Sequence, residues 1–277
     1  MKILITGANG SVGSDLVYFF SKSFFVYGVY RRLNSVNKKL KSKNIKWIKC
    51  NLDHGVNFDV NPDIIIHCAV THEFKKEKNF DDYISSNILT TQNLIKFFSK
   101  KKKIKFFNFS TYAVYNRDEK NILSITKIIS EHLLTKSNMN YLNIRLPGVL
   151  SYINQDIRRP WLNNLIYKLK KNKKIKIFNK NKSFDLVVDT YEIFRFIKFL
   201  LNKKSLLKKT VNLQPNKPIT LFKMVDFLKD KLKSKSKIKF FKKKIAKRVL
   251  SQKSFRKLNF KVASSKEIIE RYVSINL

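Results

Sequence analysis

Three glycines near the beginning of the chain have the spacing of a phosphate-binding turn. Residues 2–6 are strand-like and lead directly into Gly7, Gly10 and Gly13, and the apolar run 16–20 that follows is typical of a helix. In this context the first glycine permits a tight turn, the second lets the backbone approach a pyrophosphate, and the third lets the helix pack close to the sheet. Free N–H groups at the start of the helix attract phosphate. The stretch therefore predicts a dinucleotide site.

Two arginines are placed to select the dinucleotide. Arg31 and Arg32 follow a predicted strand over residues 24–30, and no Asp or Glu occurs between Asp15 and Asp53. An acidic residue at this place would accept hydrogen bonds from the ribose 2′-OH of NAD, whereas arginine complements the 2′-phosphate of NADP. We therefore expect NADP in preference to NAD.

The chain is strongly basic, with 59 Lys and Arg against 19 Asp and Glu and a net charge of +40. Such a charge suggests nucleic acid, an anionic membrane surface or a phosphorylated substrate as a partner. Only ten of the basic residues are arginine, the residue best suited to phosphate and base recognition, and the lysines are spread from Lys22 to Lys266. We favour a compositional origin in an A/T-rich genome, with nonspecific polyanion binding as a consequence.

Several features bear on compartment and class. Cys50 and Cys68 both fall in predicted strands, which favours reduced core cysteines in a cytoplasmic protein. Nothing resembles a signal peptide, and the most apolar run, 16–30, is interrupted by polar residues, so we expect no transmembrane segment. His67, Cys68 and His72 are close in sequence, but alternate strand residues face opposite ways, so we expect no metal site. We find no internal repeat.

The glycine segment, Thr-Gly-Ala-x-Gly-x-x-Gly, resembles the extended branch of the short-chain dehydrogenase/reductase superfamily, the NAD-dependent epimerase/dehydratase family that modifies nucleotide sugars. Similar segments follow at 62–69, 87–94, 110–115, 145–151, 184–189 and 211–214. The resemblance implies an α/β fold, with a Rossmann doubly wound parallel sheet over residues 1–150 and a smaller C-terminal substrate-binding lobe over 151–277. Within the lobe, residues 184–201 would pack back on the first domain.

Motif positions transfer a set of site residues from the family to this chain. Asn51 replaces an aspartate that contacts adenine, and Asn87 would brace the active-site strand. Arg158 and Arg159 either clamp a diphosphate, which planar guanidinium groups suit, or are surface arginines before a helix. The catalytic residues implied are Thr111 and Lys127. The cofactor-binding residues implied are Gly7, Asn9, Gly10, Ser11, Val12, Gly13, Arg31, Arg32, Asn51, Leu52, Ala69, Asn87, Lys127 and Pro147.

The family's catalytic tyrosine has no counterpart in the matching segment. The family pairs a tyrosine with a lysine four residues on, so that the ammonium lowers the tyrosine pKa and holds the nicotinamide ribose. Lys127 matches that lysine, but the tyrosine position holds Leu123. Four explanations stay open: Tyr112 or Tyr115 substitutes, the reaction needs no tyrosine, the protein binds NADP without turnover, or the shortened loop before Leu123 misaligns the motif.

These observations support two kinds of function. The first is an NADP-dependent epimerase, dehydratase or reductase acting on a nucleotide sugar in sugar-nucleotide or surface-polysaccharide metabolism, with a homodimer as an expected assembly. The second is a binding module on the same fold, either an NADP-binding regulator without catalysis or an RNA-binding protein. A peripheral protein held to anionic lipid by its lysines is a third hypothesis.

Overall fold

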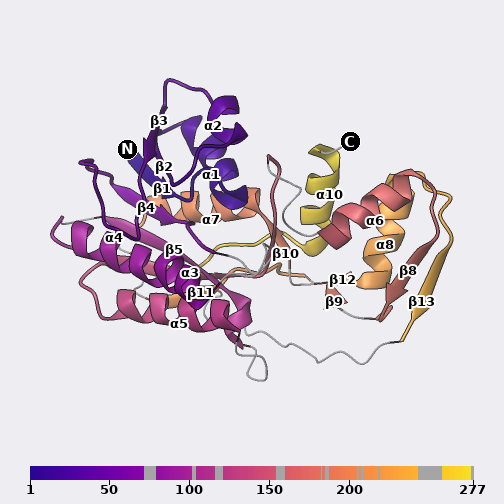
Figure 1. The fold of residues 1–277 in the computed structure, drawn as a ribbon. Coiled ribbons are helices and arrows are strands. Elements are labelled where there is room, and N and C mark those ends of the chain that lie inside the picture. The colour runs from indigo at the N-terminus through magenta and orange to yellow at the C-terminus, as the bar shows by residue number, and fades with distance from the viewer. Residues whose placement is uncertain are drawn as a thin grey trace.

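The computed structural model (Figure 1) describes residues 1–71, 79–101, 104–115, 121–153, 160–181, 183–184, 187–204, 206, 209–217, 219–242 and 258–275. Its largest part is a seven-stranded parallel sheet with strand order β11-β6-β5-β4-β1-β2-β3. From β1 the chain adds β2 and β3 towards one edge of the sheet, and from β4 it adds β5, β6 and β11 towards the other edge. The strand order therefore reverses between β1 and β4. The strands are β1 Lys2–Thr6, β2 Phe25–Tyr30, β3 Ile45–Lys49, β4 Ile64–His67, β5 Lys105–Thr111, β6 Asn140–Leu146 and β11 Lys209–Asn212.

The central strands are apolar because both faces of the sheet are covered. Ile3 and Ile5 belong to a core cluster on one face, and Leu4 belongs to a separate cluster on the other. On the first face α1 contacts α7, and on the second α4 contacts α5 (Figure 1). The helices around this sheet are α1 Ser11–Ser21, α2 Ser35–Lys39, α3 Phe80–Ile84, α4 Thr90–Phe98, α5 Ile122–Thr135 and α7 Thr190–Leu201.

Residues 80–98 do not form one regular helix. A π-helical segment, η1 Ser85–Leu89, lies between α3 and α4, and Asn87 at its centre is fully buried. A π turn changes which residues share a face, and such turns are frequent at functional sites. A short 3₁₀ segment, η2 Tyr112–Tyr115, follows β5.

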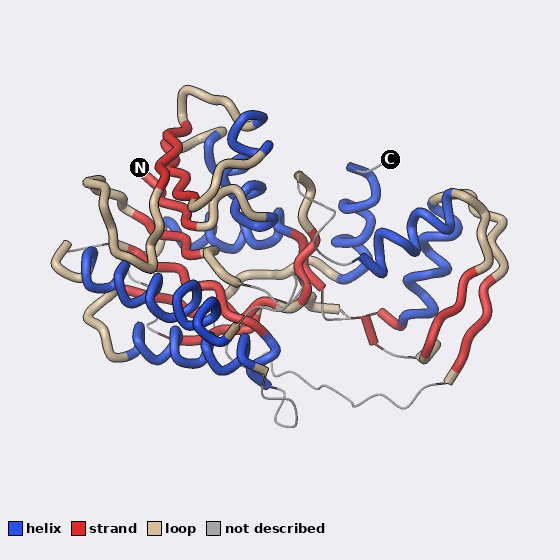
Figure 2. Tube along the Cα trace, viewed as in Figure 1, coloured by secondary structure: helices blue, strands red, loops and turns tan. Residues whose placement is uncertain are grey.

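Among its described residues, the C-terminal part contains three small strand pairs and three helices outside the main sheet (Figure 2). β7 Gly148–Leu150 pairs parallel with β10 Val187–Asp189, and β9 Ser183–Phe184 pairs antiparallel with β12 Ile219–Thr220. β8 Ile175–Phe178 pairs parallel with β13 Ile238–Phe241. The helices are α6 Pro160–Lys170, α8 Leu221–Lys231 and α10 Ser265–Ile275.

A buried acidic group joins the sheet region to the C-terminal part. Asp15 on α1 accepts hydrogen bonds from the backbone N–H groups of Tyr152 and Ile153, at 2.7 and 2.9 Å, and from the Thr190 hydroxyl. Burial raises the pKa of Asp15, and these hydrogen bonds oppose that rise. Asp189 caps α7 by accepting the Glu192 N–H at 2.8 Å, as the sequence predicted. The division at residue 150 stays a prediction.

Two absences hold for the described part of the chain. None of its helices has both the length and the apolar character needed to cross a membrane. Within the same residues, no group of three or more His, Cys, Asp or Glu side chains is arranged to hold a metal ion.

Candidate active site

The glycine turn has a geometry that only glycine accommodates at two positions. Gly7 has φ of +61°, and a Cβ there would lie 2.8 Å from the Ala69 backbone. A Cβ on Gly13 would lie 2.2 Å from the carbonyl oxygen of Gly7, so Gly13 permits the close approach of α1. Gly10 is the N-cap of α1 and provides no side-chain cap. The first N–H groups of α1 therefore have no capping side chain and suit an anionic ligand.

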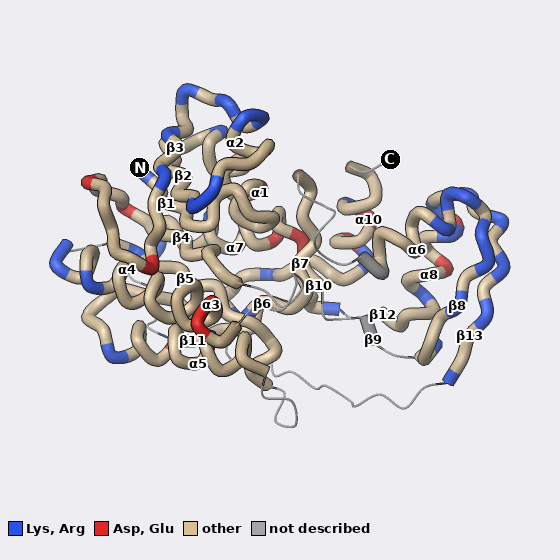
Figure 3. Tube along the Cα trace, in the orientation of Figure 1, with Lys and Arg blue, Asp and Glu red and all other residues tan. Residues whose placement is uncertain are grey.

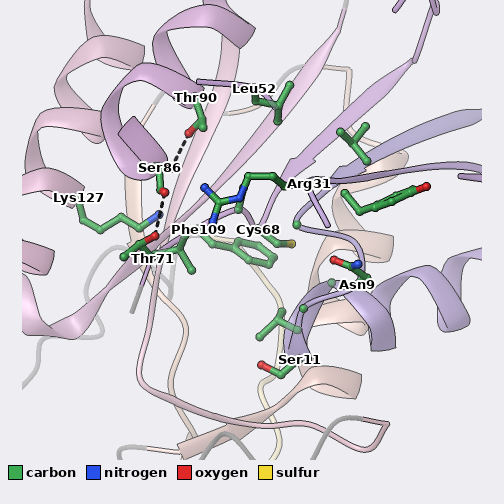
Figure 4. Close-up of a pocket in the computed structure, with 18 of the residues that line it drawn as sticks. Asn9, Ser11, Arg31, Leu52, Cys68, Thr71, Ser86, Thr90, Phe109 and Lys127 are labelled. Atoms are coloured by element: carbon green, nitrogen blue, oxygen red, sulfur yellow. Dashed lines mark hydrogen bonds between the residues drawn. The ribbon is translucent and has the colours of Figure 1, made fainter. Parts of the chain in front are cut away.

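A cavity of about 410 Å³ begins at this turn and follows the carboxyl ends of the strands to α5 (Figure 4). It lies where the strand order reverses between β1 and β4, which is the usual ligand position in open parallel sheets. All but one of the implied site residues line it: Gly7, Asn9, Gly10, Ser11, Val12, Gly13, Arg31, Arg32, Asn51, Leu52, Ala69, Thr111, Lys127 and Pro147.

Asn87 is the exception: it does not line the cavity, and its contact with the cofactor stays a prediction. Its side chain is fully buried beneath the cavity. Oδ1 accepts the Thr71 N–H at 2.9 Å, and Nδ2 donates to the Thr126 hydroxyl at 3.0 Å. Thr71 itself lines the cavity. Asn87 thus links the loop after β4 to α5, and both polar atoms of its side chain make hydrogen bonds within the protein.

The arginine end of the cavity is held to the glycine turn by asparagines. Asn9 Nδ2 donates to the Arg32 carbonyl oxygen at 2.7 Å and to Asn37 Oδ1 at 2.8 Å, and Asn34 Nδ2 donates to the Asn9 carbonyl oxygen at 2.9 Å. Both arginine side chains are exposed, and Arg31 extends across the cavity (Figure 4). The sequence analysis missed α2, whose N-cap is Asn34.

Two cavity residues that sequence reasoning missed carry polar atoms without a hydrogen-bond partner among the described residues. Asp53 Oδ1, at the β3 end, and Ser110 Oγ, at the β5 end, are both buried. A buried polar atom without a partner costs about 1–3 kcal/mol, so both atoms are suited to a ligand. Sequence reasoning could have included both residues, because each lies within two positions of a residue that the family resemblance already places in the site.

Helix α5 brings the reacting-centre residues to the inner end of the cavity. Asn121 caps this helix by accepting the Ser124 N–H at 2.9 Å. Leu123 and Lys127 lie one turn apart on the same face; both line the cavity and are 5% and 3% exposed. Lys127 extends towards Thr71 (Figure 4). The two side chains have the spacing that the family resemblance gives its tyrosine and lysine, and the assignment of Leu123 to the tyrosine position stays a prediction.

Neither suggested substitute tyrosine lies in the cavity. The Tyr112 hydroxyl donates to Gln214 Oε1 at 3.0 Å, and the Tyr115 hydroxyl donates to Asn212 Oδ1 at 2.9 Å. The tyrosine that lines the cavity in the described part of the chain is Tyr30, at the end of β2. Tyr112 and Tyr115 are therefore structural in this conformation.

A neutral histidine supports the floor of the cavity. His67 is fully buried, with Nδ1 2.7 Å from the Thr6 hydroxyl and Nε2 3.0 Å from the Thr91 hydroxyl. Burial, and secondarily the charge of Lys127, lower the pKa of His67 to about 3. The Thr6 hydroxyl also accepts the Ala69 N–H at 3.3 Å. His67 thus fixes the strand ends from which the cavity walls continue.

Glu131, the second residue of the Lys-x-x-x-Glu match, makes a structural ion pair. Arg145 Nε and Nη2 donate to its carboxylate at 2.9 and 2.7 Å, and the guanidinium lies 4.8 Å from the ring centroid of Tyr115. This pair raises the pKa of Arg145 despite partial burial. Arg158 and Arg159 lie outside the described residues.

The strand order and the glycine turn define a nucleotide-binding protein of the Rossmann class. The chain belongs to the NAD dependent epimerase/dehydratase family, whose model matches residues 3–213. This confirms the predictions of the family, of the α/β parallel-sheet fold and of an epimerase/dehydratase-like function with a nicotinamide dinucleotide as the cofactor class.

Solved structures share the fold at low sequence identity. UDP-glucuronic acid 4-epimerase from Bacillus cereus, in complex with UDP-glucuronic acid and NAD, has a TM-score of 0.77 at 19% identity, covering 100% of this chain and 99% of that chain. WbmH of Bordetella bronchiseptica, in complex with NAD+, has 0.78 at 14%, covering 99% and 98%. MoeE5, in complex with UDP-glucuronic acid and NAD, has 0.74 at 16%, covering 100% of both chains. A search of curated proteins finds no match.

Proposed function

We propose that this protein binds a nicotinamide dinucleotide along the cavity and acts on a nucleotide sugar held between the sheet and the C-terminal lobe. One observation carries the proposal: a single cavity joins the glycine turn to Thr111 and Lys127. A dinucleotide whose pyrophosphate lies on the N-terminus of α1 would then direct its nicotinamide towards α5. Asp53 Oδ1, which accepts no hydrogen bond from the described residues and lies 3.7 Å from His54 Nε2, suits the adenine amino group, and Ser110 Oγ suits a polar group at the nicotinamide end.

The form of the dinucleotide depends on Arg31 and Arg32. The structures described above contain NAD, whereas two exposed guanidinium groups at the end of β2 complement a 2′-phosphate. Asp53 also lines this end of the cavity, but it lies after β3 and not at the end of β2. We therefore propose NADP.

The reacting end supports hydride chemistry with an unusual proton path. The dinucleotide supplies the hydride acceptor or donor. The Thr111 hydroxyl can hydrogen-bond the sugar oxygen, and the Lys127 ammonium stabilises negative charge that develops on that oxygen. Leu123 cannot accept a proton, and a general base or acid at this place is worth about 10²–10⁴ in rate. Leu123 therefore favours, as a second candidate function, a protein that binds cofactor and sugar with little or no turnover.

A thermal-shift titration tests cofactor binding separately from turnover. NADPH should raise the melting temperature more than NADH does. Replacing both arginines (Arg31→Gln with Arg32→Gln) should remove most of the NADPH advantage and leave the NADH response unchanged. Lys46→Gln, an exposed position on β3, is the matched control for lost charge. Equal responses in the native protein would overturn the NADP assignment, and no response to any dinucleotide would overturn the proposed function.

The assembly proposed is a homodimer through α5. Ile125, Ile128 and Ile129 lie on one face of this helix at helical spacing and are 38%, 43% and 38% exposed. A second copy would bury this apolar stripe. The cavity side of α5, with Leu123 and Lys127, would remain in the interior of its own subunit.

A further inference from the structure

The outer face of the β8/β13 ribbon carries a repeat that sequence inspection missed. Residues 174–178 read Lys-Ile-Lys-Ile-Phe, and residues 237–241 read Lys-Ile-Lys-Phe-Phe. The two copies pair in register as parallel strands, with Ile175 opposite Ile238, Lys176 opposite Lys239 and Phe178 opposite Phe241. A five-residue similarity is expected by chance in a lysine-rich sequence, so the repeat became evident only from the pairing of the two strands.

Successive side chains of each strand point to opposite faces of the ribbon, so one face packs against the lobe and the other is exposed. Ile175 and Ile177 are buried, and Ile238 and Phe240 are half-buried against the lobe. The exposed side, here called the ribbon face, presents two copies of one pattern of two lysines and a phenylalanine. The ribbon face consists of Lys174, Lys176, Phe178, Lys237, Lys239 and Phe241, all exposed.

The part of the chain that contains the ribbon face is more basic than the chain as a whole. The two helix–loop–strand segments, 160–181 and 221–242, contain fifteen lysines and two aspartates, a net charge of +13 in 44 residues out of +40 in 277. Lysines line both loops and both strands at this end of the molecule (Figure 3). Lysines at the C-terminal ends of α6 and α8 suit the helix dipoles. Those of the ribbon face have no such structural reason.

Pairing in register makes the ribbon face electrostatically unfavourable without a partner. Lys176 lies directly opposite Lys239, and like charges at opposite strand positions are destabilising. Neither strand of the ribbon contains an acidic residue. A polyanion across the face would relieve this repulsion, so charge complementarity indicates a ligand with closely spaced phosphates.

The two phenylalanine rings identify the kind of polyanion. Phe178 and Phe241 have ring centroids 5.8 Å apart and are 48% and 41% exposed. The ring planes are tilted by 41° and each ring is about half covered, so the pair offers two exposed ring faces and not a protruding wedge of the kind that enters a bilayer. Residues two apart on a strand are separated by ~6.6 Å, so Phe178 and Phe241 are the next residues along the ribbon face after Lys176 and Lys239. Aromatic side chains beside lysines bind unpaired bases by stacking while the lysines neutralise phosphates.

We infer that the ribbon face binds single-stranded nucleic acid, with bases stacked on Phe178 and Phe241 and phosphates on the four lysines. Binding is independent of sequence, since lysine acts as a point charge and every base has a face to stack. The ribbon lies at the far end of the molecule from the dinucleotide cavity (Figure 1). The inference is therefore independent of the proposed cofactor function.

Fluorescence anisotropy with a labelled 20-nucleotide single strand tests the inference against a duplex of the same length and vesicles of mixed neutral and anionic lipid. The single strand should bind best. Phe178→Leu with Phe241→Leu keeps the apolar contact and removes the rings, and it should weaken binding by about tenfold or more without changing the salt dependence. Lys176→Gln with Lys239→Gln should reduce the slope of log K against log salt by ~1.4.

The matched control variants replace lysines on the main sheet and an aromatic residue away from the ribbon face. Lys46→Gln with Lys49→Gln removes two exposed lysines from β3, and Phe80→Leu removes an exposed ring from α3. Both controls should change single-strand affinity less than twofold, and melting curves establish that every variant is folded. Equal affinity for duplex and single strand, loss of affinity in the controls as large as in the ribbon variants, or binding to vesicles alone would each overturn the inference.

Discussion

Introducing tyrosine at position 123 should create or greatly increase hydride-transfer activity. Leu123 lines the cavity one helical turn before Lys127, so a tyrosine ring there would place its hydroxyl near the ammonium group and the Thr111 side chain. A positioned general acid or base is worth about 10²–10⁴ in rate, or about 2.7–5.4 kcal/mol of activation free energy. Leu123 is only 5% exposed, so the larger side chain should cost about 1–3 kcal/mol of stability.

The assay follows the absorbance of the reduced nicotinamide under single-turnover conditions with a panel of UDP-sugars that includes UDP-glucuronic acid. Leu123→Phe is the matched control, because it adds the ring and its packing cost without the hydroxyl. Adding Lys127→Met to the tyrosine variant should remove the gain. If Leu123→Tyr binds cofactor and sugar but is no faster than Leu123→Phe, the assignment of position 123 to proton transfer is wrong.

Two further predictions concern stability and assembly. Because the pKa of His67 in the folded chain is about 3, only the unfolded chain takes up this proton as the pH falls from about 6.5. The stabilisation present at pH 7 should therefore be lost at up to about 1.4 kcal/mol per pH unit. Urea titrations at pH 7, 6 and 5 should show a weaker pH dependence for His67→Asn, and an unchanged slope would contradict the buried neutral histidine. Ile128→Lys, in the centre of the exposed stripe of α5, should convert a dimer to a monomer in light scattering, with Lys136→Gln as the control; a native protein that is monomeric at all concentrations would refute the homodimer.

The parts of the fold that local sequence determines were predictable. Local sequence specifies helix α7, Thr190–Leu201, because Asp189 supplies a cap and the apolar residues repeat at helical spacing. The glycine turn was likewise predictable, since only glycine fits at Gly7 and Gly13. In both cases the physical constraint acts within a few residues, so sequence spacing contains it.

The parts that depend on long-range partners were not predictable. The π segment η1 is visible only once Asn87 is seen between Thr71 and Thr126. Strand β13 pairs with β8 across more than sixty residues, and no local pattern specifies that register. Asp53 and Ser110 are notable only because their polar atoms lack partners after the chain has folded.

Several residues of the family motifs are present here for reasons unrelated to catalysis. His67 holds Thr6 and Thr91, Asn87 joins the loop after β4 to α5, and Glu131 holds Arg145. Losing any of them would leave buried polar partners unsatisfied, at about 1–3 kcal/mol each. Their presence therefore follows from the fold and would be the same in a protein without turnover.

The catalytic question depends on a much smaller set. Thr111, Leu123 and Lys127 line the inner end of the cavity, and the Leu123 side chain cannot transfer a proton. Exchanging leucine and tyrosine at this buried helix position costs about 1–3 kcal/mol of stability, whereas losing a general acid or base costs about 10²–10⁴ in rate. The overall match to the family is thus strong evidence for cofactor binding and weak evidence for catalytic turnover. A measurement that separates the two, such as the Leu123→Tyr and Leu123→Phe pair, is what decides between an enzyme and a binding protein.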